Sequence, residues 1–325
     1  MSFTNFPNGV TSFGIPVFGG MPPTFGDVYF VDYRNGSADN DGKTPTSAFK
    51  LLSEAYTACS SNNNDYVFID GDQEVVETEM ITLSKNRVHT FGCNGIPPGA
   101  GYGAGARVGL GVTTAATDIA TLKNTGVRNT FTGVKFSNSN TLATNLYTVA
   151  EGGEYTRYNS CEFYKSTLLT TDLTAEVLMN GDSSQFYGCT FGDLVNERGA
   201  SGKERPNVLL TRELITGKVC RDGLFQECTF LHKAAHVDAC FFYGPNANDV
   251  ERRLIIKDSV FFNCVLATAD PADCVNFGAA QTQGDVLVIN CHSVNATAIA
   301  GASLNVYYGS NTAQTTDGIS EEVAA

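Results

Sequence analysis

The chain has 325 residues, of which 42% are hydrophobic and only 17% are charged, and its net charge is −13. This acidic balance argues against nucleic-acid binding, which needs a basic surface. No apolar run reaches the length of about 18 residues that a membrane span needs, so we expect no membrane insertion. The first twenty residues lack the charged start and apolar run of a secretory signal, so we expect the chain to fold in a cytoplasm.

Residues 1–26 carry five Phe and four Pro but no charged side chain and no periodic pattern. Such a segment cannot build its own core, yet it is too apolar to remain in water. We therefore predict an extended N-terminal arm that lies on a neighbouring molecule. The side chains expected to be buried in that partner are Phe3, Phe6, Phe13 and Phe18. The alternative is an N-terminal strand that packs on its own domain.

The segment after the arm predicts a strand, a turn-rich connection and a helix. Residues 27–33 alternate as a strand does, and residues 34–47 are rich in turn formers. Residues 48–61 place their apolar side chains on one helical face, with Thr46 or Ser47 as the N-cap. A strand at 65–71 and a pair of strands within 79–92 follow.

An acidic run lies between these strands, with five carboxylates within residues 70–79. A run of this kind is more often a solvated face than a cation site. The ten cysteines form no CxxC pair, and there are only four histidines. His232 and His236 would share a face only in a helix, where no third ligand is evident. We therefore expect no metal and no cofactor.

The most informative pattern is a short strand-like phrase in which Cys or Gly is followed two residues later by Phe. It recurs irregularly, at 129–136, 157–163, 184–191, 224–230 and 259–266, with a looser copy at 286–294. This is typical of coils stacked in a solenoid, each placing its residues over those of the preceding coil. The predicted core ladders are Cys161, Cys189, Cys228, Cys264 and Cys291, and Phe136, Phe163, Phe191 and Phe230.

These elements predict an all-β chain folded as a single-stranded right-handed parallel β-helix of about seven or eight coils. We expect the β-helix domain at 27–305, with the capping helix at about 48–61, and a C-terminal tail at 306–325. The succession of strand, turn-rich connection, amphipathic helix and strand resembles the opening segment of right-handed parallel β-helix proteins of the pectate-lyase-like type. That resemblance implies that the helix plugs the open end of the solenoid.

β-Helix enzymes act on polysaccharides through carboxylates that converge on one sheet face, or through calcium-binding carboxylates with an Arg or Lys base. No matched acids are evident at Asp258, Asp270 or Asp273. Arg252, Arg253 and Lys257 are more simply explained by salt bridges to Asp249, Glu251 or Asp258. The chain also lacks Trp, a common sugar-stacking residue. We therefore predict that the protein is not an enzyme.

The apolar opening FPNGVTSFGIPVFGG, joined to a capped β-helix, resembles virion proteins of tailed bacteriophages, particularly capsid decoration (cement) proteins. The resemblance implies a homotrimer on the outer surface of the capsid, made in the host cytoplasm. Its arm would bind the major capsid protein and stabilise the phage head. Two alternatives remain: a phage tail or tailspike β-helix that binds or cleaves host polysaccharide, and a free polysaccharide lyase or hydrolase.

Overall fold

The computed structural model describes residues 11–12, 15–16, 26–71, 74–93, 106–111, 115, 117–165, 172–196, 205–211, 219–234, 236–264, 271–278, 283–300 and 306–308. The predicted arm lies outside this part except for Gly26 and strands β1 (Thr11–Ser12) and β2 (Ile15–Pro16), which pair antiparallel. Phe3, Phe6, Phe13 and Phe18 all lie outside it. In the described part, no helix is long and apolar enough to cross a membrane.

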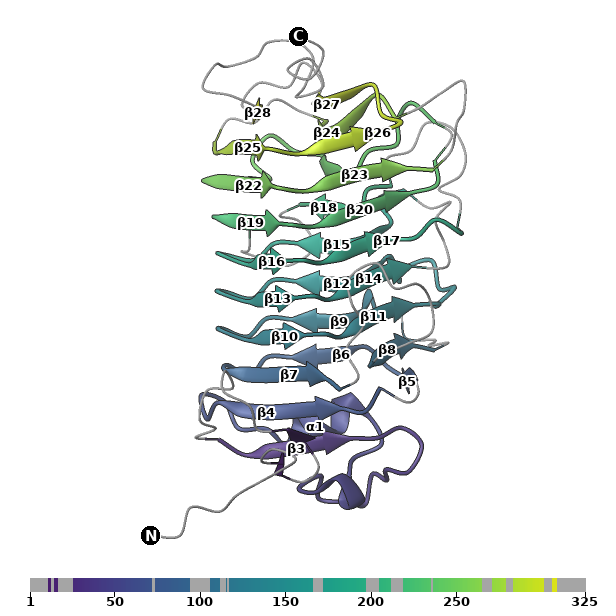
Figure 1. Cartoon of the computed structure of the whole chain (residues 1–325), viewed down its shortest axis with the longest axis vertical. Helices are drawn as coiled ribbons and strands as arrows, with labels where there is room; N and C mark the ends of the chain where they lie inside the picture. Colours follow the sequence, from purple (N-terminus) through teal and green to yellow (C-terminus); the bar gives the residue numbers. More distant parts are fainter. Residues whose placement is uncertain are drawn as a thin grey trace.

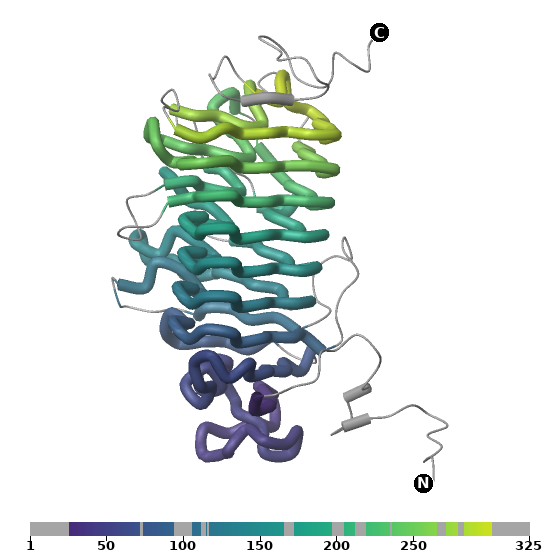
Figure 2. The backbone as a smooth tube through the Cα atoms, turned by 90° about the vertical axis from the view of Figure 1, so that its left-hand side faces the viewer, coloured from purple at the N-terminus to yellow at the C-terminus, as the bar shows by residue number. Residues whose placement is uncertain are grey.

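The chain forms a right-handed parallel β-helix built from three parallel sheets (Figure 1). Each complete coil contributes one strand to each sheet, and the coils stack along the long axis of the molecule (Figure 2). We number the three sheets 1 to 3. Sheet 1 has ten strands, and sheets 2 and 3 have eight strands each. The predicted fold class is thus confirmed.

The strands of each sheet come from successive coils. Sheet 1 contains β3 (Val28–Val31), β4 (Asp65–Ile69), β7 (Val88–Gly92), β10 (Thr130–Thr132), β13 (Arg157–Asn159), β16 (Gln185–Tyr187), β19 (Gly223–Gln226), β22 (Arg253–Lys257), β25 (Asp285–Ile289) and β28 (Val306–Tyr308). Sheet 2 contains β5 (Glu74–Glu77), β8 (Arg107–Leu110), β11 (Lys135–Asn138), β14 (Glu162–Lys165), β17 (Thr190–Gly192), β20 (Thr229–His232), β23 (Val260–Asn263) and β26 (His292–Val294). Sheet 3 contains β6 (Ile81–Leu83), β9 (Ala120–Asn124), β12 (Tyr147–Glu151), β15 (Ala175–Met179), β18 (Val208–Leu210), β21 (Phe242–Gly244), β24 (Asp273–Phe277) and β27 (Ala298–Ala300). Strand β28 falls within the segment predicted as a tail, and it pairs with β25.

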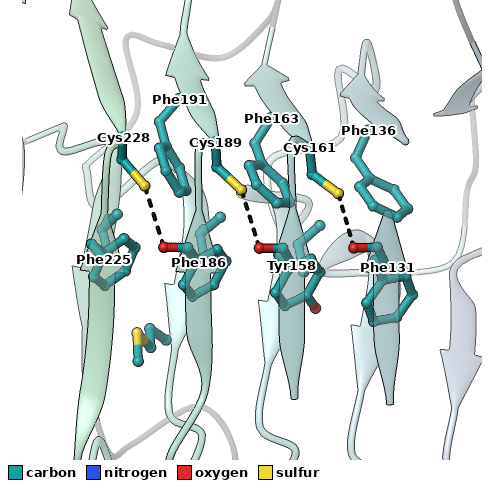
Figure 3. Packing of buried hydrophobic residues seen from close by; sticks show 14 of the residues in the cluster. Phe131, Phe136, Tyr158, Cys161, Phe163, Phe186, Cys189, Phe191, Phe225 and Cys228 are labelled. Atoms are coloured by element: carbon teal, nitrogen blue, oxygen red, sulfur yellow. Dashed lines mark hydrogen bonds between the residues drawn. The ribbon is translucent and has the colours of Figure 1, made fainter. Parts of the chain in front are cut away.

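Stacked aromatic rings fill the interior (Figure 3). Phe136, Phe163, Phe191 and Phe230 are fully buried and occupy the same register on consecutive strands of sheet 2. The Phe163–Phe191 and Phe191–Phe230 ring centroids are 5.0 and 4.9 Å apart. This spacing is close to the separation of hydrogen-bonded strands, about 4.8 Å, so identical rings pack face against face without distorting the sheet.

A two-residue turn joins sheet 1 to sheet 2 in the coils that begin with β10, and the cysteine ladder lies there. Cys161, Cys189 and Cys228 are buried, and each thiol donates to a carbonyl oxygen of the preceding coil at 3.5 Å (Figure 3). The residue before each ladder position has a positive φ, as at Gly188 (58°) and Asn290 (50°). Gly and Asn are favoured there because they tolerate the left-handed conformation.

The prediction of Cys264 as a ladder member was wrong. Cys264 follows β23 and is half-buried, and its thiol lies 4.0 Å from the carbonyl oxygen of Leu194. The ladder position of that coil belongs to Ser259, whose hydroxyl accepts from the backbone N–H of Cys228 at 3.1 Å. Cys291 resumes the ladder in the next coil. A serine fits because its volume is close to that of cysteine.

The capping helix is shorter than predicted. A 3-10 turn, η1, spans Pro45–Ser47, and α1 spans Leu52–Ala58. Thr44, rather than Thr46 or Ser47, caps η1. Residues 48–50 are not helical because Phe49 pairs with β3: its N–H donates to Phe30 and its carbonyl oxygen accepts from Asp32, both at 2.9 Å.

Glu77 supplies the N-terminal cap that the local sequence of α1 lacks. One of its carboxylate oxygens accepts from the backbone N–H of Leu52 at 2.7 Å, and the other accepts from the Ser53 hydroxyl at 2.7 Å. Burial raises the pKa of Glu77. This acid of the 70–79 run therefore holds the cap against the first coil.

We expect Glu77→Ala to lower the free energy of unfolding by about 1–3 kcal/mol, because buried N–H groups at the helix start lose their acceptor. Urea unfolding measures this change. Glu79→Ala is the matched control, because Glu79 is exposed. Equal midpoints for the two variants would contradict the capping role.

Candidate active site

A column of charged residues crosses the outer face of sheet 2 over four consecutive coils. Glu74 on β5 pairs in register with Arg107 on β8, then Lys135 on β11, then Glu162 on β14. These side chains point outward because Phe136, next to Lys135, belongs to the interior and successive strand residues alternate between faces. The neighbouring strands can be followed in Figure 1.

The two acidic ends of the column converge on one strand. Glu162 Oε2 lies 2.8 Å from Lys135 Nζ. Glu74 Oε1 lies 3.1 Å from Arg107 Nε and accepts a hydrogen bond from Ser137 Oγ at 2.6 Å. Lys135 and Ser137 are two residues apart on the same face of β11. Carboxylates from both sides therefore contact β11, Glu162 at Lys135 and Glu74 at Ser137, although their strands are three strand spacings apart.

A glycine and an aromatic ring shape this convergence. A side chain at Gly109 would collide with Glu74 Oε1 and Ser137 Oγ, so glycine opens the path by which Glu74 crosses β8. The ring of Tyr164 lies beneath both cations, 5.1 Å from Arg107 Cζ and 5.3 Å from Lys135 Nζ. The cations are thus held over an aromatic face.

The cluster has a buried floor and an accessible upper layer. Lys135, Ser137 and Tyr164 are at most 5% exposed. The side chains of Glu74 and Arg107 are 31% and 29% exposed, and that of Glu162 is 16% exposed. A molecule from solvent would therefore meet two carboxylates and one guanidinium group, held in place from below by Lys135 and Ser137. Charge-assisted contacts to preorganised groups of this kind are strong.

Sequence reasoning missed this cluster because its members are distant along the chain. Glu74 belongs to the run at 70–79, which the sequence presented as one acidic patch. The fold separates that run, since Glu77 caps α1 while Glu74 joins Arg107 on the outer face. Only the strand register, which aligns residues from different coils, could have revealed the column.

The other residues weighed from the sequence do not gather into a site. Arg252 Nη2 lies 3.2 Å from Asp182 Oδ1 and 2.9 Å from Asp222 Oδ2, on the turns between sheets 3 and 1. Asp273 opens β24, where burial raises its pKa, and Asp270 lies outside the described residues. His232 is buried against the Phe241 ring, 4.3 Å between centroids. Over the described ranges, no three His, Cys, Asp or Glu side chains are placed to hold a metal ion.

Comparison with known proteins gives the fold. No family model matches the sequence, and no curated protein sequence matches it. A pectate lyase structure superposes with a TM-score of 0.56 and 13% identity, covering 86% of this chain and 72% of that one. A pectin methylesterase from Aspergillus niger superposes with a TM-score of 0.52 and 9% identity, covering 93% of this chain and 96% of that one. A protein of Geobacillus virus E2, from open reading frame 18, superposes with a TM-score of 0.50 and 11% identity, covering 86% of this chain and 55% of that one.

The prediction that the chain is not an enzyme is overturned. Several solved structures with this fold are enzymes, namely pectin methylesterases and a pectate lyase. The premise of that prediction was also wrong, because carboxylates do converge on one sheet face with an arginine and a lysine between them. The chain thus has the right-handed parallel β-helix fold that pectate lyase and pectin methylesterases share.

Proposed function

We propose that the protein acts on a polysaccharide, with Glu74, Arg107, Lys135 and Glu162 as its active centre. The observation that carries this proposal is the convergence of Glu74 and Glu162 on β11 from opposite sides. The fold is compatible with it, since the pectate lyase and pectin methylesterase structures are built in the same way. This function corresponds to the polysaccharide-acting alternatives that the sequence left open.

The cluster suits a reaction in which a proton is removed and negative charge develops on the sugar. In this proposal the proton acceptor is Glu162, whose carboxylate lies on the outer face, 2.8 Å from Lys135 Nζ. Arg107, partly exposed on the other side of Lys135, can stabilise the developing charge. In a uronate-containing chain, loss of the proton on the ring carbon next to the sugar carboxylate would expel the glycosidic oxygen from the neighbouring ring carbon, leaving a double bond between those two carbons. Water would protonate the leaving oxygen.

We expect Glu162→Gln to lower the cleavage rate on a uronate polysaccharide by about a hundredfold or more, the usual contribution of a positioned proton acceptor. Ultraviolet absorbance of the unsaturated product measures the rate on polygalacturonate and related chains. Glu74→Gln should lower the cleavage rate by a similar factor, because Glu74 orients Arg107 and Ser137.

Glu227→Gln is the matched control, since Glu227 is exposed on a turn away from the cluster. Thermal unfolding of each variant separates loss of chemistry from loss of fold. Equal activity in Glu162→Gln, Glu227→Gln and the unaltered protein would contradict the assignment of the centre.

A place in a phage particle is a second candidate, favoured by the fold shared with the Geobacillus virus E2 protein. In this proposal, the protein is a capsid decoration protein, a homotrimer on the outer surface of the capsid. The arm at 1–26 would bind the major capsid protein through Phe3, Phe6, Phe13 and Phe18. The apolar composition of that arm supports its proposed binding to the capsid protein.

Quantitative mass spectrometry of purified virions tests this second candidate. Hundreds of copies per particle would favour the capsid shell. A handful would favour the tail, where a polysaccharide-acting protein meets the host surface. Absence from the particle would contradict both virion locations.

A further inference from the structure

We infer that Arg128, Tyr155 and Arg157 form a binding surface for a negatively charged glycan, beside the proposed active centre. All three are exposed and lie in adjacent coils where sheet 3 turns into sheet 1. The inference rests on the proposed function for what the binding serves, but the binding is argued from these residues alone.

The two arginines are unpaired in a strongly acidic chain. Within the described part of the chain, no carboxylate forms an ion pair with Arg128 or Arg157. On the corresponding turns of later coils, the acids are engaged by other arginines: Glu251 accepts hydrogen bonds of 2.7 and 2.9 Å from Arg221, and Asp222 Oδ1 lies 2.9 Å from Arg253 Nε. The guanidinium groups of Arg128 and Arg157 therefore remain available to an anion.

Arg157 is held ready for a ligand. It donates to Gln185 Oε1 at 3.2 Å, and its Cζ lies 5.2 Å from the centre of the Tyr187 ring. The Tyr187 hydroxyl donates to the same Gln185 oxygen at 3.1 Å. The planar fork of an arginine fixed in this way matches a carboxylate or sulfate bidentately.

Tyr155 is exposed in a backbone conformation that disfavours it. Its φ is 55°, and its side chain is 56% exposed. The same turn position carries Arg128 in the preceding coil and the smaller Ser183 and Asp222 in the next coils, all with positive φ. The positive φ therefore belongs to the turn itself, and what sets Tyr155 apart is a large aromatic side chain exposed there. Arg128 lies over its ring, 5.9 Å from the centroid, which leaves an aromatic face and a cation side by side.

The surface leads along the strands to the active centre. On a single coil, the outward residues Arg157, Asn159 and Glu162 follow one another from β13 into β14. Arg157 and Glu162 are five residues apart, on either side of the two-residue turn between β13 and β14, so at most about 16 Å separates them. A sugar chain lying parallel to β13 and β14 in Figure 1 could contact both places. Aromatic stacking with cationic anchoring, the chemistry offered here, suits sugar rings that carry charged groups.

Calorimetric binding of an oligogalacturonate tests the inference, in a Glu162→Gln background so that the probe is not consumed. Tyr155→Asn and Arg157→Gln should each weaken binding at least about tenfold, the usual effect of losing a contact to a charged group. Binding should also weaken as salt is raised. Arg253→Gln is the matched control, since that arginine is already paired.

Each outcome decides one point. Binding that survives in Tyr155→Asn and Arg157→Gln but is lost in Glu74→Gln would overturn the surface and leave the proposed function intact. Loss of binding in the surface variants, with no cleavage by the unaltered protein, would support the surface and contradict the function. Equal binding of the methyl-esterified probe, or tighter binding of polyglutamate, would overturn an anionic glycan as the ligand.

Discussion

Replacing Phe230 with alanine is expected to lower the free energy of unfolding by about 3–5 kcal/mol, the range for a fully buried phenylalanine. The Phe230 side chain has no exposed surface. Its ring centroid lies 4.9 Å from those of Phe191 and Phe242 and 5.2 Å from that of Phe261. Neighbours from three other strands cannot all move to fill the cavity, because each is fixed in its own coil.

Leu231→Ala is the matched control in urea unfolding. Leu231 follows Phe230 on β20, but its side chain faces outward and is only half-buried. We expect its loss to cost clearly less than that of Phe230. A near-neutral Phe230→Ala, or equal effects at the two positions, would contradict the register of sheet 2.

Alkaline pH is expected to destabilise the fold more than any single substitution. Burial raises the pKa of Cys59, Cys220 and Cys291 to about 12 and that of Cys93 to about 11. Burial also raises the pKa of Cys189 and Cys274 well above its ordinary value. In the unfolded chain thiols ionise near pH 8.5, so above that pH the unfolded state holds fewer protons than the folded state. Stability is then lost as pH rises, at about 2 kcal/mol per buried thiol by pH 10.

Lys165 opposes this trend without reversing it. Burial lowers its pKa to about 7, so the unfolded chain holds the extra proton between pH 7 and about 10, and stability rises there. One lysine is outweighed by six thiols. The urea midpoint of the unaltered protein should therefore fall between pH 7.5 and 10. The midpoint of Cys291→Ala should fall less steeply over the same range. A midpoint that is constant or rises over that range would contradict the buried, reduced cysteines.

The fold could be predicted because several of its coils share a short, recurring sequence pattern. Three consecutive coils carry Cys and Phe at a constant separation, at 161 and 163, 189 and 191, and 228 and 230, next to the two-residue turn between sheets 1 and 2. The error at Cys264 arose because Ser259 takes the ladder place in that coil, so that the next cysteine was matched instead. The predicted start of the helix was too early, because Phe49 pairs with the distant strand β3 and this contact is not visible in the local sequence.

The candidate site could not be predicted in the same way. Glu74, Arg107, Lys135 and Glu162 are 33, 28 and 27 residues apart, and each of these intervals contains a connection of different length. Lys135 and Glu162 directly precede Phe136 and Phe163 in two copies of the phrase, but no copy covers Glu74 or Arg107, so the register of the first coils is not marked. Tyr155 was missed for another reason: its exposure and its positive φ appear only once the turn is built.

The most direct test of the proposed function is a crystal structure of Glu162→Gln with an oligogalacturonate bound. We predict a sugar ring over β8, β11 and β14, with its oxygens within hydrogen-bond distance of Glu74 and Arg107. A sugar bound on the outer face of sheet 3, or a crystal saturated with the probe that leaves sheet 2 bare, would contradict the assignment of the active centre.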